Sequence, residues 1–296
     1  MSEGLVQANG IEIAYDTFGE PGDPPLLMVM GLGTQLIHWH PELCELLAKR
    51  GFHVIRFDNR DVGLTSKTAA RAPNLTRAFL GGRVEAAYRL DDMADDAFGL
   101  LDGLELDGAH VVGASMGGMI AQTMAIRRPE RVLSLASIMS TTGERRAGRP
   151  KLRVMGVLLR RAPRERTAYI EYFVKVFRKI GSPGFTTDDE QVRALAAAGY
   201  DRCYHPAGVA HQLAAILASG DRTERLRQLR VPAAVIHGRN DPLVPFRGGE
   251  ATARAIPGAK LVAIPGMGHD LPRQVWPTIV DAVVENAERA EQRQAA

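Results

Sequence analysis

One serine in the sequence stands where its hydroxyl could act as a nucleophile. The segment Gly113–Gly117 (GASMG) follows the apolar run His110–Val112 and precedes a stretch with helical spacing. A sharp strand-to-helix turn needs small residues because the backbone approaches itself closely, and it lifts the hydroxyl above the sheet edge. Free N–H groups at the start of the helix favour developing negative charge. The alternative is a glycine-rich turn with a capping serine, but the flanking patterns favour Ser115 as a nucleophile.

The elements on either side of this serine alternate along the chain. Short apolar runs followed by helix-like stretches predict a mostly parallel sheet covered by helices on both faces. Asn9-Gly10 predicts a hairpin, because this dipeptide readily takes positive φ angles. The predicted strands are Leu5–Ala8, Ile11–Tyr15, Leu26–Met30, His53–Phe57, His110–Gly113, Val132–Met139, Ala233–His237 and Lys260–Ile264. The predicted helices are Trp39–Lys49, Asp91–Leu101, Gly117–Ile126, Gly248–Ile256 and Trp276–Ala290.

The alternation stops after Ser140, and a Pro-, Arg- and Ala-rich stretch runs to about Gln228. Such a break predicts an inserted cap. Residues 141–228, here called the insert, carry 17 basic and 9 acidic residues, whereas the remainder, the frame, carries 20 and 25. Leu152, Met155 and Leu159 recur at helical spacing among arginines, which favours a helix packed on the frame with a solvated basic face. A membrane-facing or anion-facing helix is the alternative.

Length and composition exclude several classes of protein. The 296 residues allow one large or two small domains, and no biased tract prevents a packed core. The apolar runs are far shorter than the about 18 residues that cross a bilayer, and Met1–Gly10 lacks a secretory pattern. We therefore expect a cytoplasmic protein without stable membrane insertion. A net charge of +3 is too weak to indicate nucleic-acid binding, and Cys44 and Cys203 do not make a disulfide framework.

Two segments could suggest a cofactor or a metal. Gly31-Leu32-Gly33 lacks the third glycine and the acidic residue that a dinucleotide-binding loop needs. His38 and His40 are two residues apart and cannot share one helical face, and no other metal-binding motif is present. We therefore expect neither a cofactor nor a metal.

A set of short segments gives the chain its resemblance to a known family. They are Met30–Gly33 (MGLG), Trp39, Phe57–Gly63 (FDNRDVG) and Gly113–Gly117. From Gly10 to about Asn286 the chain resembles the α/β-hydrolase-fold superfamily, of the serine esterase type similar to aclacinomycin methylesterase-like hydrolases. The resemblance implies an α/β-hydrolase fold with a helical cap inserted after the sixth strand. It divides the chain into a core domain of residues 1–140 and 229–296 and a cap domain of residues 141–228.

A serine esterase needs a base that accepts the serine proton and a carboxylate that orients the base. His269 lies in the loop after the last predicted strand, where members of the family carry the catalytic histidine. Asp241 closes the preceding predicted strand, and the chain order Ser115, Asp241, His269 is that of the family. Asp241 lies in an Asn-Asp-Pro turn, which is compatible with catalysis because site residues of such sheets stand on loops at strand ends. Glu144, near the start of the insert, is a rival acid.

The other histidines considered are weaker candidates for the catalytic base. His53, His110 and His237 lie in or beside predicted strands, so we interpret them as structural. His205 and His211 lie in the insert, where a substrate contact is the alternative.

The oxyanion of a tetrahedral intermediate needs two backbone N–H donors. Met116 follows the nucleophile and is expected to supply one, and Leu32, after the first parallel strand, is expected by position to supply the other. Gly31, Gly113 and Gly117 would support the two turns. Methionine precedes Gly31 where many relatives carry histidine, which agrees with the methylesterase-like group.

These residues predict ester hydrolysis on a small-molecule substrate. Serine in place of aspartate argues against the alkyl-enzyme chemistry of haloalkane dehalogenases and epoxide hydrolases. A lactonase, a cofactor-free perhydrolase or haloperoxidase, and a receptor-like protein that binds a small ligand stay open as alternatives, as does a homodimer.

Apolar side chains of the insert are expected to line the substrate pocket. The candidates are Trp39 of the frame and Met155, Leu158, Tyr169, Phe173, Phe177 and Tyr204 of the insert. The basic excess of the insert would favour an anionic substrate or surface. Asp58, Asn59, Arg60 and Asp61 are expected to form one polar network below the site, because a buried arginine needs carboxylate partners.

Overall fold

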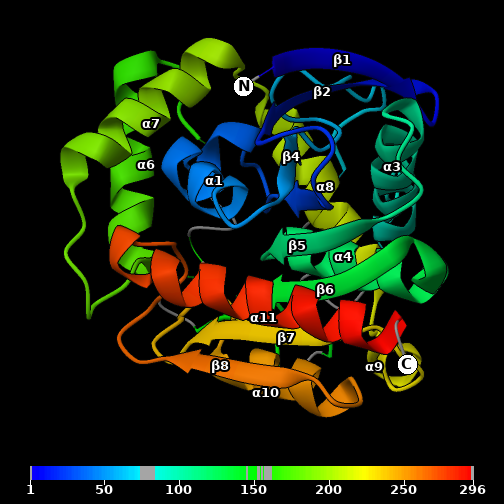
Figure 1. Cartoon of the computed structure of the whole chain (residues 1–296). Coiled ribbons are helices and arrows are strands. Elements are labelled where there is room, and N and C mark those ends of the chain that lie inside the picture. The colour runs from blue at the N-terminus through cyan, green and yellow to red at the C-terminus, as the bar shows by residue number, and fades with distance from the viewer. Residues whose placement is uncertain are drawn as a thin grey trace.

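The computed structural model describes residues 2–73, 84–144, 146–151, 154, 156 and 162–294. An eight-stranded sheet of order β1-β2-β4-β3-β5-β6-β7-β8 runs through the molecule, with helices on both faces (Figure 1). The pairs from β4 to β8 are parallel, and only the contacts of β2 with β1 and β4 are antiparallel. The mostly parallel α/β sheet predicted from the alternating pattern is thus confirmed.

The chain opens with the predicted hairpin of β1 (Ser2–Ala8) and β2 (Ile11–Phe18). Asn9 and Gly10 join the two strands with φ angles of 49° and 75°, the left-handed region that this dipeptide tolerates. β2 is longer than predicted because its second half also pairs with β4.

The parallel strands lie within one residue of their predicted bounds at each end. They are β3 (Pro25–Val29), β4 (His53–Phe57), β5 (Ala109–Ala114), β6 (Val132–Ile138), β7 (Ala233–Gly238) and β8 (Lys260–Ile264). Successive side chains point to opposite faces: Leu27 and Val29 join one core cluster, whereas Leu26 and Met28 join the other. Both faces of the inner strands β3 to β7 are therefore buried, and that is why most of them read as apolar runs. β8 lies at the edge of the sheet and begins with two exposed residues.

The frame helices divide between the two core clusters. α3 (Leu90–Gly103), α4 (Met116–Arg127) and α10 (Phe246–Ala255) contribute to the first cluster. α1 (Pro41–Ala48) and α11 (Trp276–Gln294) contribute to the second and cross the near face of the sheet in Figure 1. Three 3₁₀ turns among the described residues are η1 (Leu36–His38), η2 (Pro129–Arg131) and η3 (Arg273–Val275).

The prediction that the first helix begins at Trp39 is wrong. Trp39 and His40 have extended ψ angles of 98° and 135°, and the helix begins at Pro41. A residue before proline avoids the helical region, and the His40 ring accepts a hydrogen bond from Glu42 N–H and so caps the helix.

Between β6 and β7 the insert forms α6 (Arg166–Ile180), α7 (Asp189–Arg202), α8 (Pro206–Ser219) and α9 (Thr223–Leu226). α6 and α7 pack against each other at the left of Figure 1, whereas α8 contacts α3. Ala215 of α8 and Leu226 of α9 belong to the first core cluster. The outer part of the insert is therefore α6 and α7. The helix predicted around Leu152 and Leu159 lies outside the described residues.

The two ends of the insert are joined where they leave the frame. Arg222 N–H donates to Thr142 O at 2.8 Å, and Arg222 Nη2 donates to Thr141 O at 2.9 Å. A β carbon on Gly143 would lie 2.2 Å from Gly220 O, and Gly143 has a φ of 91°, so both space and conformation require glycine there. The insert thus leaves and re-enters the frame at one place.

Candidate active site

Ser115 occupies a strained turn between β5 and α4. Its φ is 57° and its ψ is −118°, a conformation that costs a non-glycine residue about 1–3 kcal/mol. The Ser115 N–H donates to Ile138 O at 2.9 Å, and its carbonyl accepts from the Ser140 hydroxyl at 2.7 Å and from Gly118 N–H at 3.0 Å. These bonds hold the strained turn in place.

Backbone crowding explains the two glycines that flank the serine. A β carbon on Gly113 would lie 2.2 Å from Gly117 O, and a β carbon on Gly117 would lie 2.0 Å from Val29 O. Backbone atoms cannot swing aside as a flexible side chain can. The spacing of the motif therefore follows from the close approach of β5, α4 and β3.

Three polar side chains that are far apart in the sequence meet at this turn. His269 Nε2 lies 2.9 Å from Ser115 Oγ, and His269 Nδ1 lies 2.6 Å from Asp241 Oδ2. Asp241 is 1% exposed and His269 is 8% exposed. The arrangement can pass the serine proton to one ring nitrogen while the carboxylate holds the other.

The surroundings of Asp241 keep its carboxyl ionised. Burial opposes ionisation, but the charge of His269 and the hydrogen bonds from His237 and His269 outweigh it and lower the pKa of Asp241 to about 2. Its Oδ1 also accepts the N–H groups of Leu243 and Val244 at 2.8 and 2.9 Å. Asp241 is therefore charged across the neutral pH range.

His237 is a neighbour of Asp241 that the sequence reasoning did not connect with the site. Its Nε2 lies 2.8 Å from Val244 O and 3.6 Å from Asp241 Oδ2. Because a carbonyl only accepts, Nε2 carries the hydrogen and donates it to Val244 O, and the same edge of the ring lies beside the carboxylate. Its place four residues before Asp241, at the end of β7, was the signal available in the sequence.

The loop after β3 touches the nucleophile. A β carbon on Gly31 would lie 3.2 Å from Ser115 Cβ and 3.7 Å from Ser115 Oγ. Leu32 follows in this loop and is half-buried, and Met116 is the buried first residue of α4. Both backbone segments reach the serine, and the roles of Leu32 and Met116 as oxyanion donors stay a prediction.

The rival acid lies in the turn at the start of the insert. Glu144 N–H donates to Thr142 Oγ1 at 3.2 Å, and Glu144 O accepts from Gly148 N–H at 3.0 Å. It is Asp241 that lies within hydrogen-bond distance of His269. The geometry therefore favours Asp241 as the acid.

Other histidines contact the fold away from the serine. His110 Nδ1 lies 2.9 Å from the Ser134 hydroxyl, and burial lowers the pKa of His110 to about 4. His53 is buried at the start of β4, and His211 Nε2 lies 3.1 Å from a backbone carbonyl. Burial also lowers the pKa of His205.

The aromatic residues of the insert that were proposed to contact substrate form a half-buried cluster on α6 and just after α7. Tyr169 lies 6.1 Å from Phe173 and 5.7 Å from Tyr204, measured between ring centroids. His38, in the loop after β3, lies 5.8 Å from Phe173 and so connects the cluster to the frame. The aromatic cluster is defined as His38, Tyr169, Phe173, Phe177, Tyr200 and Tyr204.

The sequence also named Trp39, Met155 and Leu158 as substrate candidates. Trp39 is fully buried in the second core cluster. Met155 lies outside the described residues, as does Leu158.

Residues 58–61 anchor separate segments, where the sequence predicted one network. Asp58 accepts the N–H of Leu36 at 2.8 Å and pairs with Arg202 of α7 at 2.5 Å. Burial raises the pKa of Asp58, although Arg202 opposes the shift. Arg60 instead pairs through two nitrogens with Asp96. The pair between Asp58 and Arg202 ties the insert to the frame.

Asn59 and Asp61 also bind separate segments. Asn59 Nδ2 donates to Met30 O at 2.9 Å, and Asp61 accepts from the Tyr88 hydroxyl at 2.7 Å. Both bonds hold loops at the carboxyl ends of the strands.

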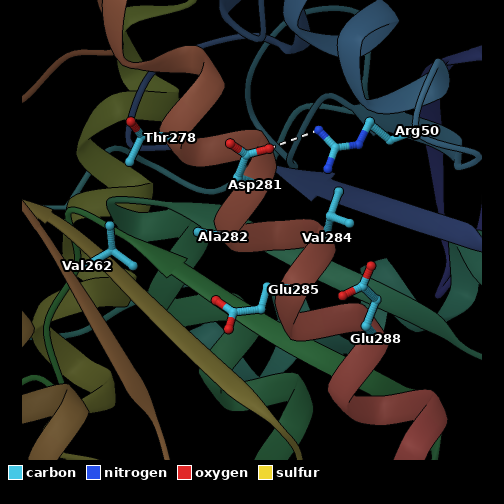
Figure 2. Close-up of a pocket in the computed structure, with 8 residues that line it drawn as sticks. All are labelled: Arg50, Val262, Thr278, Asp281, Ala282, Val284, Glu285 and Glu288. Carbon is cyan, nitrogen blue, oxygen red and sulfur yellow. Dashed lines mark hydrogen bonds and ion pairs between the residues drawn. The ribbon is translucent and has the colours of Figure 1, made fainter.

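The surface of the described residues includes two hollows. One, of about 480 Å³, runs along α11 and is lined by Arg50, Val262, Thr278, Asp281, Ala282, Val284, Glu285 and Glu288 (Figure 2). Arg50 and Asp281 form an ion pair across it at 2.9 Å, and it shares no residue with the site. The other, of about 510 Å³, lies at the end of α6 and includes Phe177, Ser182 and Asn240.

In the described part of the chain, no three His, Cys, Asp or Glu side chains gather as metal ligands would. No helix in the same residues is long and apolar enough to span a bilayer.

Comparison with known proteins finds a matching family and several relatives of the chain. Residues 24–272 match the family described as the alpha/beta hydrolase fold. The chain is 28% identical to rhodomycin D methylesterase of Streptomyces peucetius, over 97% of this chain and 98% of the relative. It is 27% identical to 3-oxoadipate enol-lactonase 2 of Acinetobacter baylyi, over 82% and 81%. The solved esterase of Exiguobacterium antarcticum superposes with a TM-score of 0.76 at 20% identity, over 97% of this chain and 100% of that chain.

Proposed function

Because the chain belongs to the alpha/beta hydrolase fold family, we propose that it hydrolyses a carboxylic ester through an acyl-enzyme formed on Ser115. One observation carries the proposal: hydrogen bonds link Ser115 to His269 and His269 to Asp241. A serine with such a base and a buried, ionised carboxylate behind it has what acyl transfer requires. The family match over most of the chain supports the same chemistry.

In the first half-reaction, Ser115 Oγ attacks the ester carbonyl carbon while His269 Nε2 accepts the hydroxyl proton. Negative charge builds on the carbonyl oxygen, where Leu32 and Met116 N–H groups would donate. The bond from carbon to the alcohol oxygen then breaks, and the alcohol leaves with the proton from His269. Asp241 stabilises the imidazolium that forms in between.

In the second half-reaction, water replaces the alcohol. His269 accepts a proton from water, and the hydroxide attacks the acyl carbon. The bond between the acyl carbon and Ser115 Oγ breaks, the carboxylic acid leaves, and the serine regains its proton from His269. No redox step and no cofactor enter this cycle.

We further propose that the substrate is a methyl ester of a bulky acid. The similarity to rhodomycin D methylesterase over 97% of this chain supports this class. Residues 141–228 would act as the cap domain, and the aromatic cluster would bind the acid part of the substrate.

The similarity to 3-oxoadipate enol-lactonase 2 favours a lactone as a second candidate substrate. The same residues would open the ring, because a lactone is a cyclic ester. The two candidates differ in product: a methyl ester releases methanol, whereas a lactone keeps its alcohol on the acid.

The experiment compares the wild type with Ser115→Ala on p-nitrophenyl esters of increasing acyl length, on methyl esters of aromatic acids and on lactones. Circular dichroism verifies that the variant is folded. We expect kcat/KM to fall by about a thousandfold or more in Ser115→Ala. A folded wild type that hydrolyses none of these substrates would contradict the proposal.

A further inference from the structure

The loop that carries His269 is held from two sides, and the first support belongs to the frame. Gly266 N–H donates to Asn240 Oδ1, and Asn240 N–H donates to Met267 O, both at 3.0 Å. These bonds join the loops that follow β7 and β8. They fix the first half of the His269 loop.

The second support comes from the insert, at the C-terminal end of α6. His269 N–H donates to Ile180 O at 2.7 Å, and Gly268 N–H donates to Ser182 Oγ at 2.8 Å. The Ser182 hydroxyl in turn donates to the Asp270 carboxylate. His269 and both of its neighbours in the chain are therefore hydrogen-bonded to the insert.

The two backbones also approach too closely for side chains. A β carbon on Gly268 would lie 2.2 Å from Gly181 O, and a β carbon on Gly184 would lie 2.5 Å from Gly266 Cα. Gly184 N–H donates to Gly266 O at 3.0 Å. A displacement at the end of α6 must therefore move the His269 loop with it.

Ser182 is the side chain that joins these contacts. It is 5% exposed, accepts one hydrogen bond from the loop and donates another to it. Ser182 follows the C-terminal end of α6, and α6 carries Tyr169, Phe173 and Phe177 of the aromatic cluster. The base and the aromatic cluster are thus connected through one short segment.

We propose that Ser182 is a positioning residue through which the insert holds His269 in register with Ser115. The inference rests on the proposed function, since it takes His269 to be the base. A substrate bound against α6 would then align the base as well as the ester. Binding in the insert and chemistry in the frame become coupled through Ser182.

The test uses a fluorophosphonate, which labels an activated serine without any knowledge of the natural substrate. Ser115 Oγ bonds to phosphorus, the P–F bond breaks, fluoride leaves and His269 accepts the hydroxyl proton. We expect Ser182→Ala to lower the labelling rate at saturating probe by about ten- to a hundredfold. The half-saturating probe concentration stays unchanged, because binding does not use Ser182. Ser182→Thr keeps the hydroxyl and restores most of the rate.

Ser219→Ala is the matched control. The Ser219 hydroxyl donates to Ala215 O at 2.7 Å and accepts from Leu90 N–H at 3.0 Å, so it also bridges insert and frame, at the far end of α8. We expect this variant to label at the wild-type rate.

Labelling of Ser182→Ala at the wild-type rate would overturn the inference, and so would an equal loss in Ser219→Ala. A wild type without Ser115-dependent labelling would instead overturn the proposed function, and the inference with it. If Ser182→Ala fails to fold, Ser182→Cys takes its place, because a thiol keeps the size but donates weakly. Labelling of that variant at the wild-type rate would equally overturn the inference.

Discussion

The frame and the insert hold their functional residues in different ways. In the frame, Ser115, Asp241 and His269 stand on loops at the carboxyl ends of β5, β7 and β8, where the backbone leaves little freedom. In the insert, half-buried rings stand on α6, on α7 and just after it. The ion pair between Arg202 and Asp58, hydrogen bonds and the close backbone contact at the end of α6 join these helices to the frame. Under the proposed function, we therefore expect the backbone to fix the positions of the catalytic groups and the exchangeable side chains of the insert to set the substrate.

The contrast predicts its largest effect at Asp241. Asp241→Asn keeps the size of the side chain but favours the wrong tautomer of His269, so kcat should fall by about ten-thousandfold. Glu144→Gln, in the insert, should leave kcat unchanged. Steady-state kinetics of the two folded variants checks this. A larger loss of kcat in Glu144→Gln than in Asp241→Asn would identify Glu144 of the insert as the catalytic acid residue.

Gly117→Ala tests the crowding of the frame. The added β carbon would meet Val29 O at 2.0 Å, and we expect the free energy of unfolding to fall by more than about 4 kcal/mol. Gly22→Ala is the control, because a β carbon there meets nothing within 4 Å. Urea unfolding measures both variants. A Gly117→Ala variant as stable as Gly22→Ala would show that the turn has more room than the fold implies.

Arg202→Met tests whether the ion pair between Arg202 and Asp58 holds the insert on the frame. The change leaves the fully buried Asp58 without its cation, and we expect a loss of about 3 kcal/mol in the free energy of unfolding. Arg166→Met, which breaks the exposed pair with Asp201, should change stability little. The double variant Asp58→Asn with Arg202→Met should recover part of the loss. If the double variant recovers none of the lost free energy of unfolding, the ion pair between Arg202 and Asp58 does not hold α7 on the frame.

Acid should weaken the protein through its buried histidines. Burial lowers the pKa of His110 in the frame and of His38 beside the insert to about 4, from an ordinary value of 6.5. The unfolded chain binds these protons first, so their contribution is complete above about pH 6.5 and is lost as the pH falls towards 4. Each should cost about 2 kcal/mol at pH 4.5.

Denaturant unfolding at pH 7.5 and 4.5 measures this loss, with His110→Gln and His38→Gln as the variants. Each variant should lose about half of the acid sensitivity that the pair confers. If only His38→Gln reduces the acid sensitivity, that sensitivity arises at the junction of the frame and the insert. An acid response unchanged in both variants would contradict the account.

The sequence predicts the frame better than the contacts of the site. β4 and β8 match their predicted bounds because each is a short run rich in β-branched and apolar residues between turn segments. Ser115 was predictable because its motif records a local backbone constraint. The extended conformation before Pro41 was missed, although the restriction that proline imposes on its predecessor is also local.

Contacts between the insert and the frame escaped the sequence reasoning. Ser182 and Gly268 are 86 residues apart, and Arg202 and Asp58 are 144 apart. A serine at a helix end or an arginine on a helix is ordinary by itself. Only the packing of the insert on the frame gives either residue its partner.

Under the proposed function, Ser115 carries the acyl group during turnover. Rapid quenching of the enzyme with an activated ester, followed by mass spectrometry of the peptide that contains Ser115, can detect this acyl group. We expect a transient mass increase equal to the acyl group on Ser115, and no increase in folded Ser115→Ala. Hydrolysis that continues at the wild-type rate in Ser115→Ala, without any adduct, would contradict it.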